Sequence, residues 1–392
     1  SAKARKEKEM NPSIINATVG SYYDESGQIK VFRCVKEAFE KPDYNNYLSY
    51  SSVKGSNEFI EAIKDWVLGS DYQDKYTNYY LNAIATCGGT GAIALAFATY
   101  LEKNEGVMLP NIMWPAYLQI ATNLEINHHV YNLYNENGRL DLANIKEVAN
   151  KLQVKYDKLF LVINDPCHNP TGYSLSEDEW KEVISFLNEC SKTHAVVLLN
   201  DIAYIDFSSR QDKAKEYFAQ FDQIEKNFVV IVAFSLSKSM TSYGLRCGAA
   251  IVLGQEKEAV RQVKIVFEKD ARATWSNINN GAMATFVDVL DNHKDAYDQE
   301  RLHYVNLLKE RGNIFVKEAK EVGLKHYPYK EGFFVTLSMD NETRDKFHEA
   351  LMENNIFTVK VNLGIRVAIC SLSVEKTKGL AKKMKDILDT VA

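Results

Sequence analysis

The sequence has few cysteines, and their spacing excludes the two common cysteine frameworks. Six cysteines are spread over 392 residues, and no two of them form a Cys-x-x-Cys pair. Such spacing is typical of neither a structural zinc site nor a disulfide-stapled domain. We therefore predict free thiols, no bound metal, and a protein of the reducing cytoplasm.

Long apolar runs and an excess of positive charge are also missing. No stretch approaches the ~20 apolar residues of a membrane-spanning helix, so we predict no membrane partner. The net charge of −5 argues against a nucleic-acid-binding protein. Residues 1–10 are charged and have no apolar centre, unlike a secretory signal, and a frayed helix is one interpretation of them.

The hydrophobic residues that are present, 46% of the chain, are grouped into strands and helices that alternate. Alternation of this kind predicts an α/β fold with a mostly parallel sheet covered on both faces, and from residue 332 onward a smaller α+β domain. The expected strands are 106–110, 159–164, 195–199, 228–234, 249–253, 333–338, 357–361 and 365–370. The expected helices are 31–39, 57–67, 92–101, 180–190, 256–273, 282–290, 297–322, 343–354 and 376–391, with a loop at 45–56.

One lysine follows a predicted buried strand in a setting that suits covalent chemistry. A Ser-x-Ser-Lys motif ends at Lys238, directly after the strand at 228–234, and Arg246 follows between two glycines. A lysine there is costly to desolvate unless it is used, and Schiff-base chemistry requires an amine of lowered pKa among short neighbours. Ser235, Ser237 and Arg246 would offer hydroxyls and a fixed charge to a phosphate. The alternative is a surface turn with a solvated lysine.

Two other segments carry polar groups where ligands of parallel sheets gather, at the carboxyl ends of strands. Asn169 lies in a His-Asn-Pro-Thr-Gly loop, and Asp201 in Asn-Asp-x-Ala-Tyr; both follow predicted strands. A cluster of glycines at 88–91 precedes the helix at 92–101 and suits a phosphate at a helix N-terminus. A tight helix–helix contact explains the glycines equally well, and they do not form a Walker loop.

Taken in order, these motifs resemble the fold-type I pyridoxal-phosphate (PLP) aminotransferases, in the aspartate and aromatic subgroup. The resemblance covers nearly the whole chain. It implies a three-layer PLP-dependent transferase fold with a mostly parallel central sheet, and a homodimer with shared active sites. We expect residues 1–40 to join the small domain, 41–290 to form the large PLP-binding domain, and 291–392 to form the small C-terminal domain.

The resemblance also implies roles at the cofactor. Lys238 resembles the lysine that binds PLP as a Schiff base, and Asp201 the aspartate at the ring nitrogen. Tyr204 and Asn169 match donors to the phenolate oxygen, and Trp114 matches the stacking aromatic. The phosphate would be held by Gly89, Thr90, Ser235, Ser237 and Arg246, with Tyr50 from the neighbouring subunit. Taken alone, each of these features has a purely structural alternative. Asp201 would cap a helix, the Asn-Pro-Thr-Gly segment would form a turn, and Trp114 would belong to the hydrophobic core.

Two arginines match the substrate-binding residues of this subgroup. Arg366 resembles the clamp for the α-carboxylate, to which a planar guanidinium is well matched. Arg272 matches an arginine that reaches across the dimer to a side-chain carboxylate, although a solvated helix arginine is the alternative. Gly20, with Val19, resembles a mobile N-terminal segment that closes over substrate.

The sequence departs from the subgroup in two places. Asn164 stands where a histidine is usual, which alters a contact to Asp201. Ile278 and Asn279 replace the prolines that often follow Trp-Ser-Asn, next to Arg272. The second departure bears on substrate choice.

The expected activity is transfer of an amino group between an amino acid, aspartate or glutamate, and a 2-oxo acid. Within enzymes, the alternatives are an aromatic aminotransferase or another PLP reaction on the same fold, such as a β-lyase or decarboxylase. Outside enzymes, the alternative is a regulatory or binding module that has kept the fold.

Overall fold

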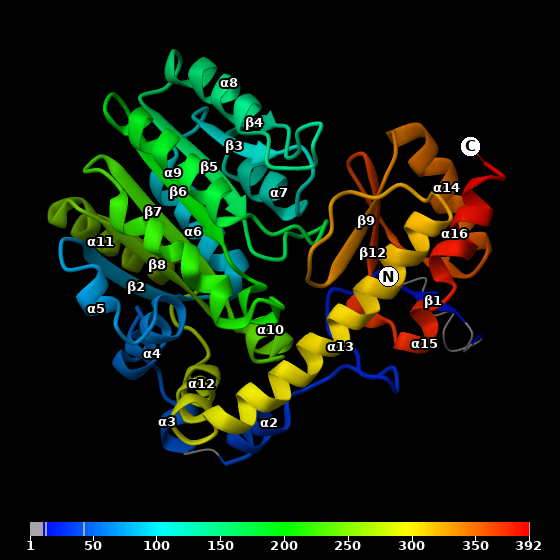
Figure 1. Ribbon diagram of the computed structural model, residues 1–392. Coiled ribbons are helices and arrows are strands. Elements are labelled where there is room, and N and C mark those ends of the chain that lie inside the picture. The colour runs from blue at the N-terminus through cyan, green and yellow to red at the C-terminus, as the bar shows by residue number, and fades with distance from the viewer. Residues whose placement is uncertain (1–10, 12–13, 42–43, 392) are drawn as a thin grey trace.

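A long helix joins a large and a small sheet in the computed structural model, which describes residues 11, 14–41 and 44–391 (Figure 1). This helix, α13 (Lys294–Glu321), packs at one end on α12 (Asn280–Asn292) and at the other beside the small sheet. The frayed helix considered for residues 1–10 lies outside the described residues. The boundaries expected at residues 40 and 290 stay a prediction.

The large sheet has seven strands, and all but one run parallel, which confirms the predicted architecture. Its order is β2 (Tyr80–Thr86), β8 (Gly248–Gly254), β7 (Phe228–Ser235), β6 (Ala195–Asp201), β5 (Lys158–Asn164), β3 (Gly106–Pro110) and β4 (Asn127–Tyr131). The exception is β8, which runs antiparallel to both of its neighbours, β2 and β7. The carboxyl ends of β5, β6 and β7 therefore meet along one edge.

Both faces of the large sheet are buried because successive residues of each strand point to opposite sides. In β6, Leu198 belongs to one core cluster and Leu199 to another. The cluster with Leu199 contains α6 (Gly88–Tyr100), α7 (Ala116–Asn123) and α11 (Lys257–Thr274). The cluster with Leu198 contains α8 (Leu142–Gln153), α9 (Glu177–Ser191) and the 3₁₀ segment η2 (Gln211–Gln223). Helices therefore cover both faces.

The small sheet is built from the C-terminal quarter of the chain and is antiparallel. Its order is β11 (Val359–Val361), β12 (Gly364–Ala368) and β9 (Phe334–Ser338), with α14 (Asn341–Glu353) packed against it. The N-terminal strand β1 (Ile15–Asn16) pairs in parallel with β10 (Ile356–Phe357). The N-terminal segment thus returns to the C-terminal part of the molecule.

Three expectations for local structure were wrong. The strand predicted over 357–361 is two strands of different sheets, β10 and β11. The helix predicted over 376–391 is two helices, α15 (Val374–Thr377) and α16 (Leu380–Leu388), because Gly379 between them has a φ of 73° that ends the helical path. The loop predicted over 45–56 contains the short helix α3 (Tyr44–Leu48). The other elements are α2 (Arg33–Phe39), α4 (Asn57–Leu68), α5 (Tyr72–Lys75), α10 (Leu236–Ser239), η1 (Ile205–Phe207), η3 (Tyr243–Leu245) and η4 (Ile369–Ser371).

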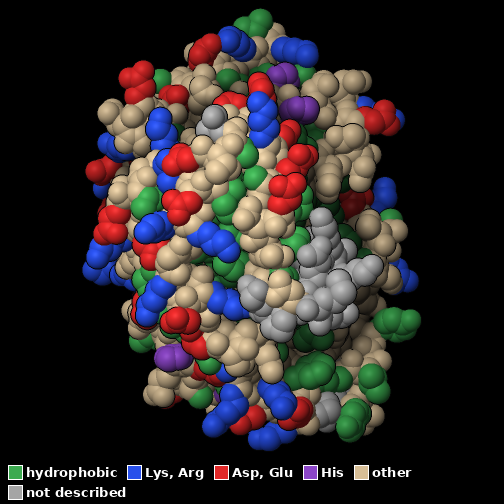
Figure 2. Space-filling view, turned by 90° about the vertical axis from the view of Figure 1, so that its right-hand side faces the viewer, with side chains coloured by type: hydrophobic (Ala, Val, Ile, Leu, Met, Phe, Trp, Pro, Cys, Tyr) green, Lys and Arg blue, Asp and Glu red, His purple; other side chains and the backbone are tan. Residues whose placement is uncertain are grey.

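Charge is mixed on the surface formed by the small sheet and its helices. Figure 2 shows acidic and basic side chains interspersed on this face, without a broad area of one sign. Within the described part of the chain, no helix is both long enough and apolar enough to cross a bilayer.

Candidate active site

Most of the polar residues singled out in the sequence line a single pocket at the carboxyl edge of the large sheet. Lys238 follows β7, Asp201 ends β6, and Asn169 lies in the loop after β5. The N-terminus of α6 closes another side. The lining residues are Gly89, Thr90, Ile93, Trp114, Asn164, Asn169, Asp201, Ala203, Tyr204, Ser235, Ser237, Lys238 and Arg246.

Lys238 is presented to the pocket by the short helix α10. Ser235 caps this helix, since its hydroxyl accepts a hydrogen bond from the backbone N–H of Ser237 at 3.3 Å. The Lys238 ammonium lies 5.2 Å from the centre of the Tyr204 ring. Burial lowers the pKa of Lys238, the charge of Asp201 opposes this, and Arg246 lowers it further. The lysine therefore exists as a free amine at lower pH than an exposed lysine would.

Asp201 is a buried carboxylate with a donor on each oxygen. Its Oδ1 accepts the backbone N–H of Ala203 at 3.1 Å, and its Oδ2 accepts the hydroxyl of Tyr117 at 2.6 Å. Burial raises the pKa of Asp201, while both hydrogen bonds and Lys238 oppose that rise. Sequence reasoning missed Tyr117. No pattern near Tyr117 in the sequence predicts this contact, because the two residues are 84 positions apart.

Asn164 and Asn169 connect the carboxylate side of the pocket to Arg366. Asn164 donates to the main-chain carbonyl of Asp201 at 2.8 Å and accepts the N–H of Asn169 at 2.7 Å. Asn169 Oδ1 accepts from Arg366 Nη1 at 3.1 Å, and its Nδ2 donates to the Tyr204 hydroxyl at 3.4 Å. Asn164, which stands where the subgroup usually has a histidine, thus hydrogen-bonds to main-chain atoms. The side-chain hydrogen bond to the Asp201 carboxylate comes from Tyr117 instead.

Arg366 lies on β12 and reaches from the small sheet toward the pocket. Its guanidinium stacks 4.2 Å from the centre of the Phe334 ring, and its Nη2 donates to the carbonyl of Thr18 at 3.1 Å. Its Nε is buried and has no hydrogen-bond partner. A guanidinium with an unused donor matches the geometry of a carboxylate.

The N-terminal segment with Gly20 lies directly over Arg366. Besides the Thr18 contact, the thiol of Cys370 donates to the carbonyl of Val19 at 3.4 Å. The backbone N–H of Tyr22 donates to the hydroxyl of Tyr243 at 2.9 Å. These bonds place the segment where it can cover a bound molecule.

The opposite end of the pocket collects donors suited to a phosphate. Arg246 donates from Nη1 to the Ser237 hydroxyl at 3.0 Å. A Cβ on Gly88, whose φ is 67°, would stand 2.8 Å from Arg246 Nη2, so the glycine permits this approach. Thr90 and Arg246 are exposed, and this end of the pocket is open in the single chain.

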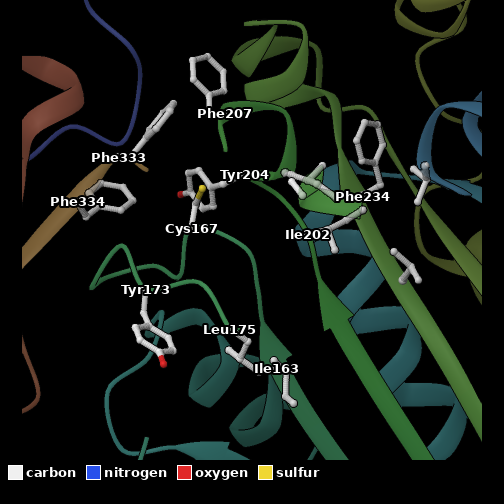
Figure 3. Close-up of a cluster of buried hydrophobic side chains, with 14 of the residues drawn as sticks. Ile163, Cys167, Tyr173, Leu175, Ile202, Tyr204, Phe207, Phe234, Phe333 and Phe334 are labelled. Carbon is white, nitrogen blue, oxygen red and sulfur yellow. The ribbon is translucent and has the colours of Figure 1, made fainter. Parts of the chain in front are cut away.

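Tyr204 belongs to the loop after β6, and its ring packs against the small sheet. The ring centres of Phe333 and Phe334 lie 5.1 and 5.8 Å from that of Tyr204. Figure 3 shows the Tyr204, Phe333 and Phe334 side chains in this cluster. Packing therefore fixes the Tyr204 hydroxyl next to Asn169, at the junction of the two sheets.

Tyr50 and Arg272 are not brought to this pocket within the single chain. Tyr50 is 91% exposed, and Arg272 is exposed with a hydrogen bond to the Ser276 hydroxyl at 2.8 Å. Their segments are tied together, because Asn277 donates to the carbonyl of Ser51 at 3.0 Å.

The two residues that depart from the proline pattern have structural roles. Ile278 is buried, and Asn279 caps α12 by accepting the N–H of Ala282 at 3.0 Å. Among the described residues no three His, Cys, Asp or Glu side chains gather into a metal site.

Comparison with known proteins points to one family. The model of "Aminotransferase class I and II" matches residues 12–384. An aspartate aminotransferase of Salmonella typhi is 28% identical over 327 residues, which cover 80% of this chain and 78% of that protein. The crystal structure of an aminotransferase from Anaerococcus prevotii matches with a TM-score of 0.93 and 32% identity, covering 100% of this chain and 94% of that one. An aromatic-amino-acid aminotransferase from Burkholderia pseudomallei, described as covalently bound to pyridoxal phosphate, matches with a TM-score of 0.81 and 20% identity over 99% and 96% of the two chains.

Proposed function

The chain belongs to the class I and II aminotransferases, and we propose that it uses PLP to move amino groups between a dicarboxylic amino acid, aspartate or glutamate, and a 2-oxo acid. One observation carries this proposal. An amine of lowered pKa, Lys238, lies in one pocket with the buried carboxylate of Asp201, and Arg366 reaches toward it.

The residues present fit this cofactor. Hydroxyls, a helix N-terminus and a guanidinium gather at one end of the pocket, as a phosphate requires. Lys238 and Asp201 supply an amine for the aldehyde and a carboxylate for the ring nitrogen. The residues that would hold PLP are Gly89, Thr90, Trp114, Asn169, Asp201, Tyr204, Ser235, Ser237, Lys238 and Arg246.

When bound, PLP supplies an electron sink for the negative charge left at the substrate Cα. Lys238 would act as general base and then as acid: its neutral amine would take the proton from the substrate Cα and return it at the cofactor carbon C4′. Burial makes that amine available nearer neutral pH. Asp201, kept in place by its two donors, would stabilise a protonated ring nitrogen.

Arg366 orients the substrate. Its unpaired Nε and its Nη groups would grip the α-carboxylate, while Asn169 links this clamp to Tyr204. The segment with Gly20 would exclude water above the reacting atoms, because Arg366 and Cys370 already hold its carbonyls.

We further propose a cytoplasmic homodimer whose subunits share their active sites. Tyr50 and Arg272 are large side chains held at the surface by neighbouring segments, and the phosphate end of the pocket is open. A two-fold pair would bring both residues to the partner's pocket at once. The Arg272 guanidinium would then bind the side-chain carboxylate of an acidic substrate. The six free cysteines suit a reducing compartment.

The test is kcat/KM for aspartate, glutamate, phenylalanine and tyrosine with a 2-oxo acid acceptor, combined with sedimentation of the active species. We expect the two acidic donors to be preferred and the active species to be a dimer. Preference for phenylalanine and tyrosine would assign the aromatic activity instead. If the donor is converted but the 2-oxo acid acceptor is not aminated, the protein is a lyase. If PLP and donor bind but no product forms, the protein is a regulatory module.

A further inference from the structure

Tyr117 lies behind Asp201, outside the residues that line the pocket. It is fully buried, and its hydroxyl lies 2.6 Å from Asp201 Oδ2. A short O–H···O⁻ distance of this kind marks a charge-assisted hydrogen bond, which is among the strongest in proteins. The side chain is therefore placed to act on the carboxylate without touching a bound molecule.

The fold leaves this phenol little freedom. Tyr117 is the second residue of α7 and packs in the core cluster between α6 and the sheet. Its ring lies edge-on to Trp114, with ring centres 5.5 Å apart and planes at 85°. The start of α7 thus contributes two side chains: Trp114, just before the helix, lines the pocket, and Tyr117 donates to Asp201.

We propose that Tyr117 is a positioning residue that fixes Asp201 Oδ2 and keeps that carboxylate ionised for the cofactor's ring nitrogen. This inference rests on the proposed function and adds a residue to it. Each carboxylate oxygen can accept two hydrogen bonds, so the Ala203 N–H on Oδ1 and the phenol on Oδ2 leave acceptor capacity for the ring nitrogen.

The charges around Asp201 explain why a neutral donor is needed. Burial favours the protonated acid, and the groups that face Asp201 are Tyr117 from α7, Lys238 from α10 and Tyr204 from the following loop. Lys238 must be uncharged to act as a base, so its electrostatic support of the carboxylate is lost at that point. The pKa of Tyr117 is raised well above its usual value by burial and by Asp201, so the phenol remains a donor at all working pH values.

The experiment compares Tyr117→Phe with Tyr131→Phe. Tyr131 is also a buried phenol near the sheet, but its hydroxyl donates to the main-chain carbonyl of Val162 at 2.9 Å. In the cofactor-free protein, carboxyl-carbon NMR, assigned with Asp201→Asn, reports the titration of Asp201. Tyr117→Phe removes a donor to the charged form, so the pKa of Asp201 should rise, whereas Tyr131→Phe should leave it unchanged.

Activity gives a second readout. In Tyr117→Phe, the acid limb of the kcat profile should move to higher pH, and kcat should fall about 10-fold with little change in KM. Replacing Tyr117 with 3-fluorotyrosine, a stronger donor that keeps the ring in place, should lower the pKa of Asp201 instead. This variant preserves the test if Tyr117→Phe folds poorly.

An unchanged Asp201 titration in both Tyr117 variants, or an equal shift in Tyr131→Phe, would overturn the inference. That outcome is distinct from failure of the proposed function, which would show as absence of PLP binding and amino transfer in the unaltered protein. The cofactor-free titration decides the role of Tyr117 in either case.

Discussion

The enclosed and the exposed parts of the candidate site differ in how completely one chain builds them. Lys238, Asp201 and Asn169 are fixed by strand ends, caps and hydrogen bonds. Tyr50 and Arg272 stand on the surface, one 91% exposed and the other bonded only to a residue of its own helix end among the hydrogen bonds described. We infer that the enclosed residues carry out proton transfer, and that the exposed residues act in the pocket of a second subunit.

The largest effect should come from removing the amine. Lys238→Ala should lower amino transfer by more than about 10⁴-fold, because no other group can take the Cα proton at that place. Lys215→Met is the matched control, since Lys215 is another lysine whose pKa burial lowers, but it lines a separate cavity. Steady-state turnover checks this, and a borohydride-reduced adduct on any lysine other than Lys238 would refute the assignment.

Asp201 should rank next in the enclosed part. Asp201→Ala should lower kcat by about 10²–10³-fold in the PLP-saturated enzyme, with KM nearly unchanged, because the carboxylate acts on charge that develops in the transition state. Asp201→Asn keeps the shape and should lose rate similarly. Turnover close to that of the unaltered enzyme would mean that Asp201 only supports the loop.

In the exposed part, Arg272→Ala should act selectively. For aspartate and glutamate, kcat/KM should fall about 30-fold to several thousand-fold, or roughly 2–5 kcal/mol, because a buried carboxylate loses its partner. Phenylalanine and tyrosine should lose much less, and Arg272→Asp should repel acidic donors. Arg261→Ala, an exposed arginine of the same helix paired with Glu258, is the control. An equal loss for all four donors would remove Arg272 as the clamp.

The smallest effect should come from Tyr50. Tyr50→Phe should weaken PLP binding about 3- to 10-fold, the contribution of one hydrogen bond to a phosphate. Tyr80→Phe, another exposed tyrosine, should change nothing. Titration of the cofactor-free protein with PLP measures both, and unchanged affinity in Tyr50→Phe would place this tyrosine outside the site.

The enclosed residues of the site could be predicted from the sequence because each is marked by a pattern within one short segment. A buried strand followed by a polar motif predicts both the fold and the position of a side chain, as for β7 with Lys238 and β6 with Asp201. The edge strand β4 was missed because its residues are mostly exposed, so Asn127 to Tyr131 carry no apolar run. The 3₁₀ segment η2 was also missed, although its buried residues Ala214, Tyr217, Phe218 and Phe221 follow the spacing of an amphipathic helix.

Contacts between segments that lie far apart in the chain could not be predicted from a single sequence. Tyr117 and Asp201 lie 84 positions apart, and nothing in either segment predicts their hydrogen bond. The departure at Asn164 was noticed, but its bonds to main-chain atoms depend on the path of the following loop. Exposed residues are harder still, because their roles depend on a second chain.

The most direct test of the shared site is complementation between two inactive variants. Chains carrying Lys238→Ala and chains carrying Arg272→Asp are mixed under conditions that exchange subunits, and amino transfer from aspartate is measured. If Arg272 serves the partner's pocket, each hybrid dimer has one intact site, and random mixing should restore about a quarter of the unaltered activity. No recovery in a mixture shown to contain hybrid dimers would contradict the account, because Arg272 would then act in its own chain.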